Sequence, residues 1–392
     1  MSNLGSKPSI QLPDDFRFGE LRPDQKTVPP PSPPPPLGPL AAFDGTFVGN
    51  GFNTIFRPNS TATPTKLPNP VPPAPPPHDN VLELNLTSET LAFSKSLGSV
   101  PNRGTATQAD AFLNGVPYLQ SVNDITIHGE SVPIHFEPGL WMHVPPTTTP
   151  ALQDTVTRMA SIPHGTTIEA QGLVSAPIKG PPTIDPVDIT PIIIATNQPF
   201  RFPSQTAADP NTLRIPQDLS SFITRGTITQ DILNNPNLLL SDLIKRQTIL
   251  ATTAIFISTA PPPPAGLFGG GTANIAFLLG QAAATAPNAQ STKMTAVFWI
   301  ETVQEQIDIA VHRKGHKFTV KGALITPGQQ VPTFTGTIPI DMTAPRKLTV
   351  TYTQIQYTQT VILSFNGLFW PHVSVNTLVP ADPVEVPESA WT

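Results

Sequence analysis

The sequence predicts a mainly β fold built as an antiparallel barrel, and three observations point to that class. Proline is abundant, with 51 residues in a chain of 392, and proline interrupts helices. Charged residues make up only 12% of the chain, half of the ~25% typical of soluble domains. The third observation is a series of roughly ten segments rich in Thr, Val, Ile and Phe, residues that suit pleated strands.

The strand-like segments are separated by Gly, Pro and Asn, which favour turns. They cover residues 43–56, 80–93, 117–127, 134–144, 152–162, 166–171, 295–311, 333–340, 347–365 and 369–378. Many short strands with turn signals between them favour a barrel or a sandwich. We therefore expect a β-barrel domain over residues 41–385.

Residues 1–40 are predicted to form a proline-rich N-terminal arm. Its run VPPPSPPPPLGPL, at residues 28–40, favours polyproline II, as does a second tract at 67–77. Either tract could bind an SH3-like partner, or it could lie as a stiff strap on the protein's own surface. Residues 386–392 are expected to be a C-terminal tail.

Residues 216–280 are predicted to be an insertion between strands, with one to three short helices. Leu239, Leu240, Leu243 and Ile244 have helical spacing, and Thr227 or Ser241 could cap a helix. A third proline run, at residues 261–264, connects two apolar stretches within this insertion.

Charge and cysteine content exclude several classes of protein. The net charge is −5 with no basic stripe, so nucleic acid is not an expected partner. The chain has no cysteine, which excludes disulfides and thiol chemistry. No apolar run reaches the ~18 residues of a membrane span, and the N-terminus lacks an apolar leader. We expect a soluble cytoplasmic protein with no membrane partner, and homo-oligomerisation stays open.

The segment HFEPGLWMH, at residues 135–143, concentrates groups that could bind a ligand. His135, Glu137, Trp141 and His143 share a parity, so they face the same side of a regular strand. Three alternatives are a His/Glu/His metal site, contact with a ligand in the barrel lumen, and packing around Trp141. Pro138 and the following glycine make a bulge at this point an expectation as well.

Two further segments belong to the ends of the predicted barrel. In GTFVGNG, at residues 45–51, Phe47 is expected to plug the lumen while the glycines let the strand bend. In LFWPHVSVNTL, at residues 368–378, His372 lies in an otherwise apolar strand. A lone histidine of this kind is more often a satisfied core residue than a ligand.

Other candidate sites are less specific. The basic cluster HRKGHK, at residues 312–317, indicates a solvated turn at Gly315, or alternatively an anion site at a barrel mouth. No GxSxG, HExxH or EF-hand pattern is present. An enzyme of this sequence would therefore rely on a cofactor for its reactivity.

In order along the chain, GTFVGNG, HFEPGLWMHVPP, GTTIEAQG and LFWPHVSVNTL resemble the nitrobindin-like heme-binding β-barrels, relatives of the lipocalin and fatty-acid-binding calycins. The resemblance implies a calycin-like barrel that binds heme b, with His372 of the Pro-His pair as the iron ligand. Phe47 stands where the family usually has Trp, and the arm and the insertion have no counterpart in the family.

A heme protein of this family could act on peroxide, peroxynitrite or NO, and whether the chain is an enzyme stays open. The resemblance leaves His135, His143, Trp141 and Arg158 as residues that would contact the cofactor. One alternative is a heme-free carrier or barrel enzyme for an apolar small molecule, anchored by Arg158 or Arg346. Another is a structural or assembly protein strapped by its proline-rich segments.

Overall fold

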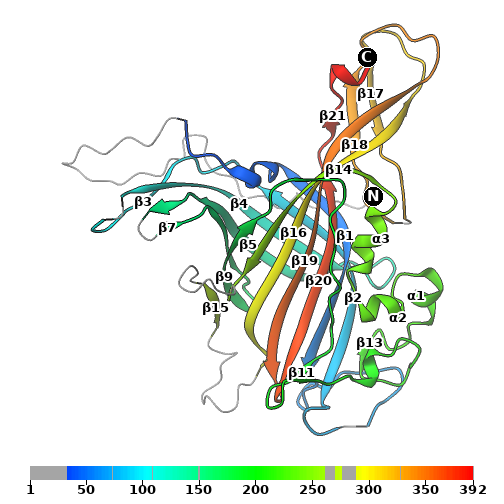
Figure 1. Cartoon of the computed structure of the whole chain (residues 1–392). Coiled ribbons are helices and arrows are strands. Elements are labelled where there is room, and N and C mark those ends of the chain that lie inside the picture. Colours follow the sequence, from blue (N-terminus) through cyan, green and yellow to red (C-terminus); the bar gives the residue numbers. More distant parts are fainter. Residues whose placement is uncertain are drawn as a thin grey trace.

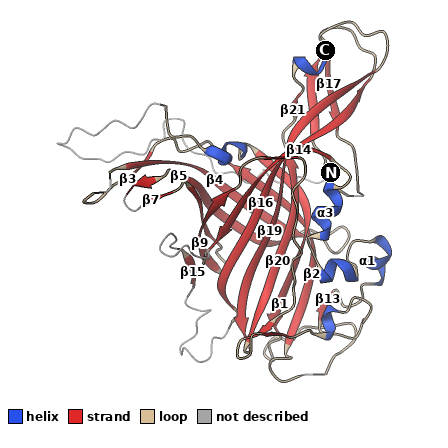
Figure 2. Cartoon of the chain, in the orientation of Figure 1, coloured by secondary structure: helices blue, strands red, loops and turns tan. Residues whose placement is uncertain are grey.

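The computed structural model describes residues 33–391, except 73, 108, 149–150, 261–269, 276–287 and 327. Residues 1–32 of the expected arm and the proline run at 261–264 lie outside the described residues. The structure confirms the mainly β class: ten antiparallel strands close into one barrel (Figure 1, Figure 2).

Around the barrel, each wall strand pairs with the next in the order of the chain. These strands are β1 (Thr46–Pro58), β2 (Asn80–Phe93), β4 (Ala111–Asp124), β5 (Val132–Val144), β8 (Thr155–Ser161), β9 (Thr166–Val174), β14 (Thr248–Ser258), β16 (Gln290–Ile309), β19 (Arg346–Phe365) and β20 (Leu368–Pro380). The barrel closes where β20 pairs with β1 from Phe47↔Pro380 to Thr54↔Val373. Alternate residues of each strand face the lumen.

Short strands lie at the rims of the barrel and in its connections. They are β3 (Val100–Asn102), β6 (Thr147–Thr148), β7 (Ala151–Leu152), β10 (Ile178–Lys179), β11 (Ile192–Ile193), β12 (Gln198–Pro199), β13 (Arg214–Ile215) and β15 (Gly271–Asn274). Most of the predicted strands coincide with wall strands. Residues 333–340 instead contribute to a small separate sheet.

The insertion has different limits from those predicted. It carries the expected short helices α1 (Ser220–Arg225), α2 (Gln230–Asn234) and α3 (Leu238–Ile244), together with the 3-10 helix η2 (Pro203–Gln205). However, it occupies residues 175–247, because β14 within the expected insertion is a strand of the wall. The sequence of β14, TILATTAIFIS, is a short apolar run, and periodicity alone does not distinguish such a strand from other buried segments.

The insertion covers the outer face of part of the barrel. Phe52 on β1, Leu84 on β2 and Val375 on β20 point outward and pack with Phe202 and Leu233 of the insertion in one buried cluster. A second core thus lies outside the wall, whereas the inward neighbours of these residues, such as Asn53 and Asn376, are polar.

A projecting arm extends β16 and β19 beyond the barrel (Figure 1). Here β17 (Lys317–Lys321), β18 (Thr333–Thr337) and β21 (Val384–Glu385) form a separate sheet with its own buried cluster. The expected C-terminal tail contains the 3-10 helix η3 (Glu388–Trp391), and Trp391 packs on Phe318. The basic cluster lies in this arm, in the turn between β16 and β17, where Gly315 has a φ of 85°.

The described end of the proline-rich arm covers one end of the lumen through the 3-10 helix η1 (Gly38–Ala42). The carbonyl oxygen of Pro35 accepts a hydrogen bond from Nδ2 of Asn114 at 2.7 Å. Leu40 is fully buried, and the ring of Phe43 stacks on Phe93 with centroids 4.6 Å apart. This part of the arm is therefore a strap on the protein's own barrel.

Candidate functional site

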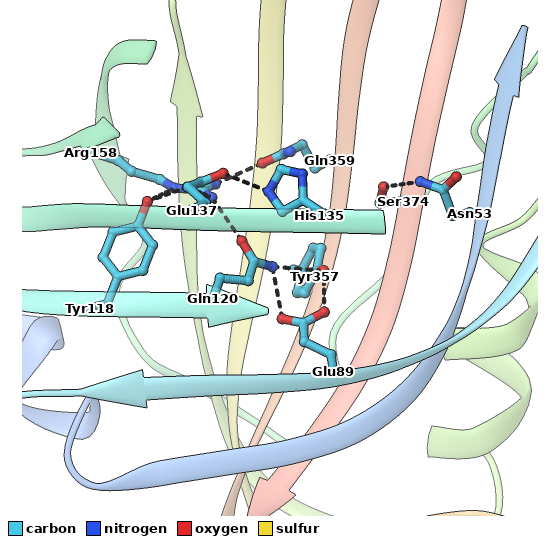
Figure 3. Close-up of polar contacts among 10 residues, drawn as sticks. All are labelled: Asn53, Glu89, Tyr118, Gln120, His135, Glu137, Arg158, Tyr357, Gln359 and Ser374. Atoms are coloured by element: carbon cyan, nitrogen blue, oxygen red, sulfur yellow. Dashed lines mark hydrogen bonds and ion pairs between the residues drawn. The ribbon is translucent and has the colours of Figure 1, made fainter. Parts of the chain in front are cut away.

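The barrel interior contains a continuous network of polar side chains from several wall strands (Figure 3). It begins at His135 and Glu137 of β5, passes through Arg158 of β8 and Gln120 of β4, and reaches Glu89 of β2. Each of these residues lies on the inward face of its strand. The period of two along a strand thus brings together groups that are far apart in the sequence.

Arg158 is the only cation of the network and is 2% exposed. Its guanidinium contacts Oε1 of Glu137 at 2.5 Å and donates to the hydroxyl of Tyr118 at 2.8 Å and to Gln359 at 2.7 Å. Burial by itself would raise the pKa of Glu137, but the charge of Arg158 and several hydrogen bonds lower it to about 2. The pair is therefore ionised, and each nitrogen of the Arg158 guanidinium makes a hydrogen bond within the protein.

Glu89 is the second buried carboxyl group of the network. It accepts hydrogen bonds from Nε2 of Gln120 at 2.8 Å, from the hydroxyl of Tyr357 at 2.6 Å and from Nδ2 of Asn376 at 2.7 Å. Burial raises the pKa of Glu89, although these donors act in the opposite direction. Glu89 connects the network to β20, the strand that carries His372.

His135 lies at the edge of the network and is held by a carboxylate. Its Nε2 lies 3.1 Å from Oε2 of Glu137. Because an ionised carboxylate only accepts, Nε2 of His135 carries the hydrogen. The ring also meets His164 of the β8–β9 turn edge to face, with centroids 5.4 Å apart. The side chain is 20% exposed, so solvent reaches this part of the lumen.

His372 shares the inward parity of β20 with Ser374 and Asn376. Its Nδ1 lies 3.1 Å from the carbonyl oxygen of Thr54; a carbonyl only accepts, so Nδ1 carries the hydrogen and Nε2 keeps its lone pair. Burial and the nearby charge of His135 lower the pKa of His372 to about 4. The imidazole is therefore neutral at neutral pH, and the described residues provide no hydrogen-bond partner for its Nε2.

The structure brings together only some of the predicted site residues. His135 and Arg158 both contact Glu137, whereas His372 faces the lumen from β20 and contacts the backbone of Thr54. His143 lies instead beneath η1, with Nδ1 2.9 Å from the carbonyl oxygen of Pro36 and Nε2 3.4 Å from Asp154. Trp141 is 2% exposed and packs edge to face on Phe298. Both are thus occupied by contacts within the protein near the covered end of the barrel.

Arg346 does not lie in the lumen. It belongs to the projecting arm, where it donates to the carbonyl oxygen of Trp391 at 2.8 Å. Sequence reasoning also missed several lumen residues, among them Glu89, Tyr357, Asn376 and His164. Glu89 carried a usable signal, because a charged residue at an inward position of an alternating strand requires partners inside the barrel.

Two hollows are found in the described structure, and His372 lines neither of them. One of about 300 Å³ lies between η1 and the upper ends of β14, β16 and β19, with Thr253, Thr302 and Thr353 in its lining. The other, of about 380 Å³, is formed by β5, β8 and β9. Within the described part of the chain, no three His, Asp or Glu side chains are grouped so that they could hold a metal ion. The alternative of a His/Glu/His metal site at residues 135–143 is thus not supported, because His135 contacts Glu137 while His143 lies beneath η1.

Comparison of the chain with protein families, with curated proteins and with solved structures finds no match. Among the described residues, no helix has the length and apolar character needed to cross a membrane. Assignment of a function therefore depends on the chemistry of the barrel interior.

Proposed function

We propose that the chain is a heme-binding β-barrel protein in which His372 is the iron ligand. The observation that carries the proposal is the state of this side chain: a neutral imidazole whose Nδ1–H is held by the carbonyl of Thr54 and whose Nε2 is free. Backbone carbonyls orient metal-bound imidazoles in this way, and neutral imidazole is a common axial ligand of heme iron.

The donor set of this region fits heme better than it fits a bare metal ion. A structural metal ion needs three or four protein ligands, and no such cluster exists among the described residues. Heme needs only one axial ligand from the protein. When bound, heme supplies ligand-binding and redox chemistry at its iron, which is the basis for proposing peroxide, peroxynitrite or NO as reactants.

The residues of the chain have separate parts in this proposal. His372 would bind the iron, Thr54 would orient His372, and the ionised Glu137 would fix the position of His135 beside the ligand. Arg158 would act through Glu137, because each nitrogen of its guanidinium already makes a hydrogen bond within the protein. A cytoplasmic location belongs to the same proposal.

The heme-free carrier has less support from the same interior. A carrier for an apolar acid needs a free cation as its anchor, and Arg158 is already paired with Glu137. A carboxylate ligand would have to displace a buried, ionised partner. The alternative of a structural or assembly protein is supported only by the segment that contains η1. This segment packs on the barrel of its own chain.

The test is a spectroscopic titration of the full chain with hemin. We expect a Soret band with saturable binding, and about a tenfold or greater loss of affinity in His372→Ala. His143→Ala is the matched control, because it removes an equally inward histidine that lies under η1, and it should bind hemin like the wild type. Equal hemin affinity of wild type and His372→Ala would refute the ligand assignment.

A further inference from the structure

The second proline-rich tract, at residues 67–77, lies in the connection between β1 and β2. Figure 1 shows this connection, in blue, as a wide loop at the end of the barrel opposite the projecting arm. From residue 67 to residue 75, each residue either is a proline or precedes one. Proline fixes its own φ at about −65°, and it disfavours the helical conformation of the residue before it. The tract is therefore restricted to extended conformations such as polyproline II, which has three residues per turn.

Exposure along the tract repeats every three residues, as expected for polyproline II that lies with one edge on the protein. The half-buried edge consists of Val71, Ala74 and Pro77. The other two edges are exposed and carry Pro72 with Pro75, and Pro70 with Pro76. Pro72 and Pro75 thus present the spacing of a PxxP motif toward solvent.

The insertion holds the tract near both of its ends. Nε2 of Gln217 donates to the carbonyl oxygen of Asn69 at 2.7 Å, and its Oε1 accepts from the backbone nitrogen of Asn69 at 2.8 Å. Just beyond the other end, the ring of His78 contacts those of Phe200 and Phe202, with centroids 5.4 and 5.9 Å apart. The extended form is therefore held before a partner binds, which lowers the entropic cost of binding.

Between these two anchors, the backbone of the tract offers hydrogen-bond acceptors. In the part of the chain that the structure describes, no donor contacts the carbonyl oxygens of Val71, Pro72 or Ala74. The sequence has no charged residue between Lys66 and Asp79. The exposed surface thus consists of proline rings and carbonyl oxygens. Trp and Tyr side chains complement both, because they provide an apolar ring and a hydrogen-bond donor.

We infer that the exposed prolines Pro70, Pro72, Pro75 and Pro76 form a docking site for a protein domain that binds polyproline II in a groove lined by aromatic side chains. The groove contacts the two exposed edges, and the edge of Val71 stays on the surface of the chain itself. The inference does not depend on heme, since the site lies outside the barrel.

The test measures binding of the full chain to a panel of purified SH3, WW and EVH1 domains by biolayer interferometry. We expect saturable binding by at least one domain of the panel. The double variant Pro72→Ala/Pro75→Ala should bind that domain about tenfold more weakly, because two anchoring rings are lost from the groove. Urea unfolding of this variant should match that of the wild type, since both prolines are exposed.

Two matched controls assign the loss to the exposed edges. Val71→Ala trims a side chain of the half-buried edge, and Pro64→Ala removes an exposed proline of the same connection that precedes the tract. Both variants should bind like the wild type. An equal loss in Val71→Ala would contradict the orientation of the tract and overturn the inference.

A free peptide of residues 66–79 distinguishes a docking site from a strap that only covers the chain's own surface. We expect the peptide to bind the same domain about fivefold more weakly than the full chain, because the free peptide is not held in its extended form. Binding by the peptide but not by the full chain would show a strap. That result, no binding by any domain of the panel, or full binding by Pro72→Ala/Pro75→Ala overturns the inference.

Discussion

Arg158 and Glu137 form a buried ion pair, and its effect on the free energy of unfolding is measured by removing one partner. Glu137→Gln would leave the guanidinium of Arg158 charged and unpaired at 2% exposure. We expect the free energy of unfolding to fall by about 3–5 kcal/mol, measured by urea unfolding. Asp242→Asn breaks the exposed pair with Lys245 and should change stability by about 1 kcal/mol or less. Similar small losses in both variants would contradict a buried, ionised pair of Arg158 and Glu137.

The low pKa of His372 has consequences for both stability and ligand binding. Its folded pKa of about 4 lies below the usual ~6.5, so the unfolded chain binds this proton more strongly. The contribution of the neutral His372 to the free energy of unfolding is therefore fully present above pH ~6.5 and is lost as the pH falls toward 4. Hemin affinity should therefore be constant from pH 7.5 to 5.5, as measured by Soret titration. A loss of affinity centred near pH 6.5, with the far-UV circular dichroism unchanged, would show an ordinary exposed imidazole.

At the scale of elements, the insertion is organised around Arg214 of β13, which is fully buried. Its guanidinium donates to six backbone carbonyls, those of Ser204, Thr206, Ala207, Asp209, Pro216 and Gln217. Burial lowers its pKa to about 10, so the side chain stays charged at neutral pH. One arginine thus shapes a segment that has little regular structure of its own.

Arg214→Met should therefore open the insertion before the barrel. We expect a loss of about 3 kcal/mol or more, because several buried carbonyls would lose their donor. Hydrogen exchange followed by mass spectrometry should show faster exchange at residues 203–217, with β16 and β19 protected. Arg225→Met, at the exposed end of α1, is the control and should exchange like the wild type. Equally accelerated hydrogen exchange in the barrel and in the insertion would refute the prediction that the insertion opens before the barrel.

Glu301 of β16 connects the insertion to the wall and titrates near neutrality. It is 1% exposed and accepts from Gln354 at 2.6 Å, and Gln354 in turn pairs with Gln247 of the insertion. Burial raises the pKa of Glu301 to about 7. The folded state thus holds this proton more strongly than the unfolded state. The contribution of Glu301 to the free energy of unfolding is therefore fully present below pH ~4.5 and is lost as the pH rises through 7.

Glu301→Gln should remove this pH dependence. The variant should be more stable than the wild type at pH 8, on the order of 2 kcal/mol, and nearly equal to it at pH 5. Urea unfolding at the two pH values measures the difference, with the exposed Glu130→Gln as control. A variant that is less stable than the wild type at pH 8 would mean that the ionised carboxylate is favourable at this position.

The wall strands were predictable because their own residues carry the signal. Segments such as NVLELNL alternate apolar and polar residues between turn formers, and β2 follows that pattern. The insertion was not predictable in the same way. It depends on Arg214 and on contacts with the outer faces of β1 and β20, and neither leaves a periodic pattern in residues 175–247.

The candidate site was predictable from the sequence only in part. His372 was singled out by a resemblance, and its lone position in an apolar strand did not reveal the carbonyl of Thr54 318 residues away. The pairing of Arg158 with Glu137 likewise depends on the register of β5 with β8. Local pattern shows which residues face inward, whereas closure of the barrel decides which of them meet.

At the scale of the whole molecule, the projecting arm that contains β17, β18 and β21 is structurally separate from the barrel interior. Phe334 of β18 is fully buried in the arm, where it packs on Tyr352. Phe334→Ala should destabilise the arm by about 3–5 kcal/mol and leave hemin affinity unchanged, as measured by unfolding and by Soret titration. Leu91→Ala, in the cluster of the barrel interior, is the comparison that should affect the lumen. A loss of hemin affinity in Phe334→Ala would mean that the arm takes part in the site.

The most direct test of the heme proposal is a crystal structure of the full chain with hemin. The proposal predicts one heme inside the barrel, with its iron bonded to Nε2 of His372 while Nδ1 still donates to the carbonyl of Thr54. Hemin on the outer surface, or iron bonded to a different histidine, would contradict it.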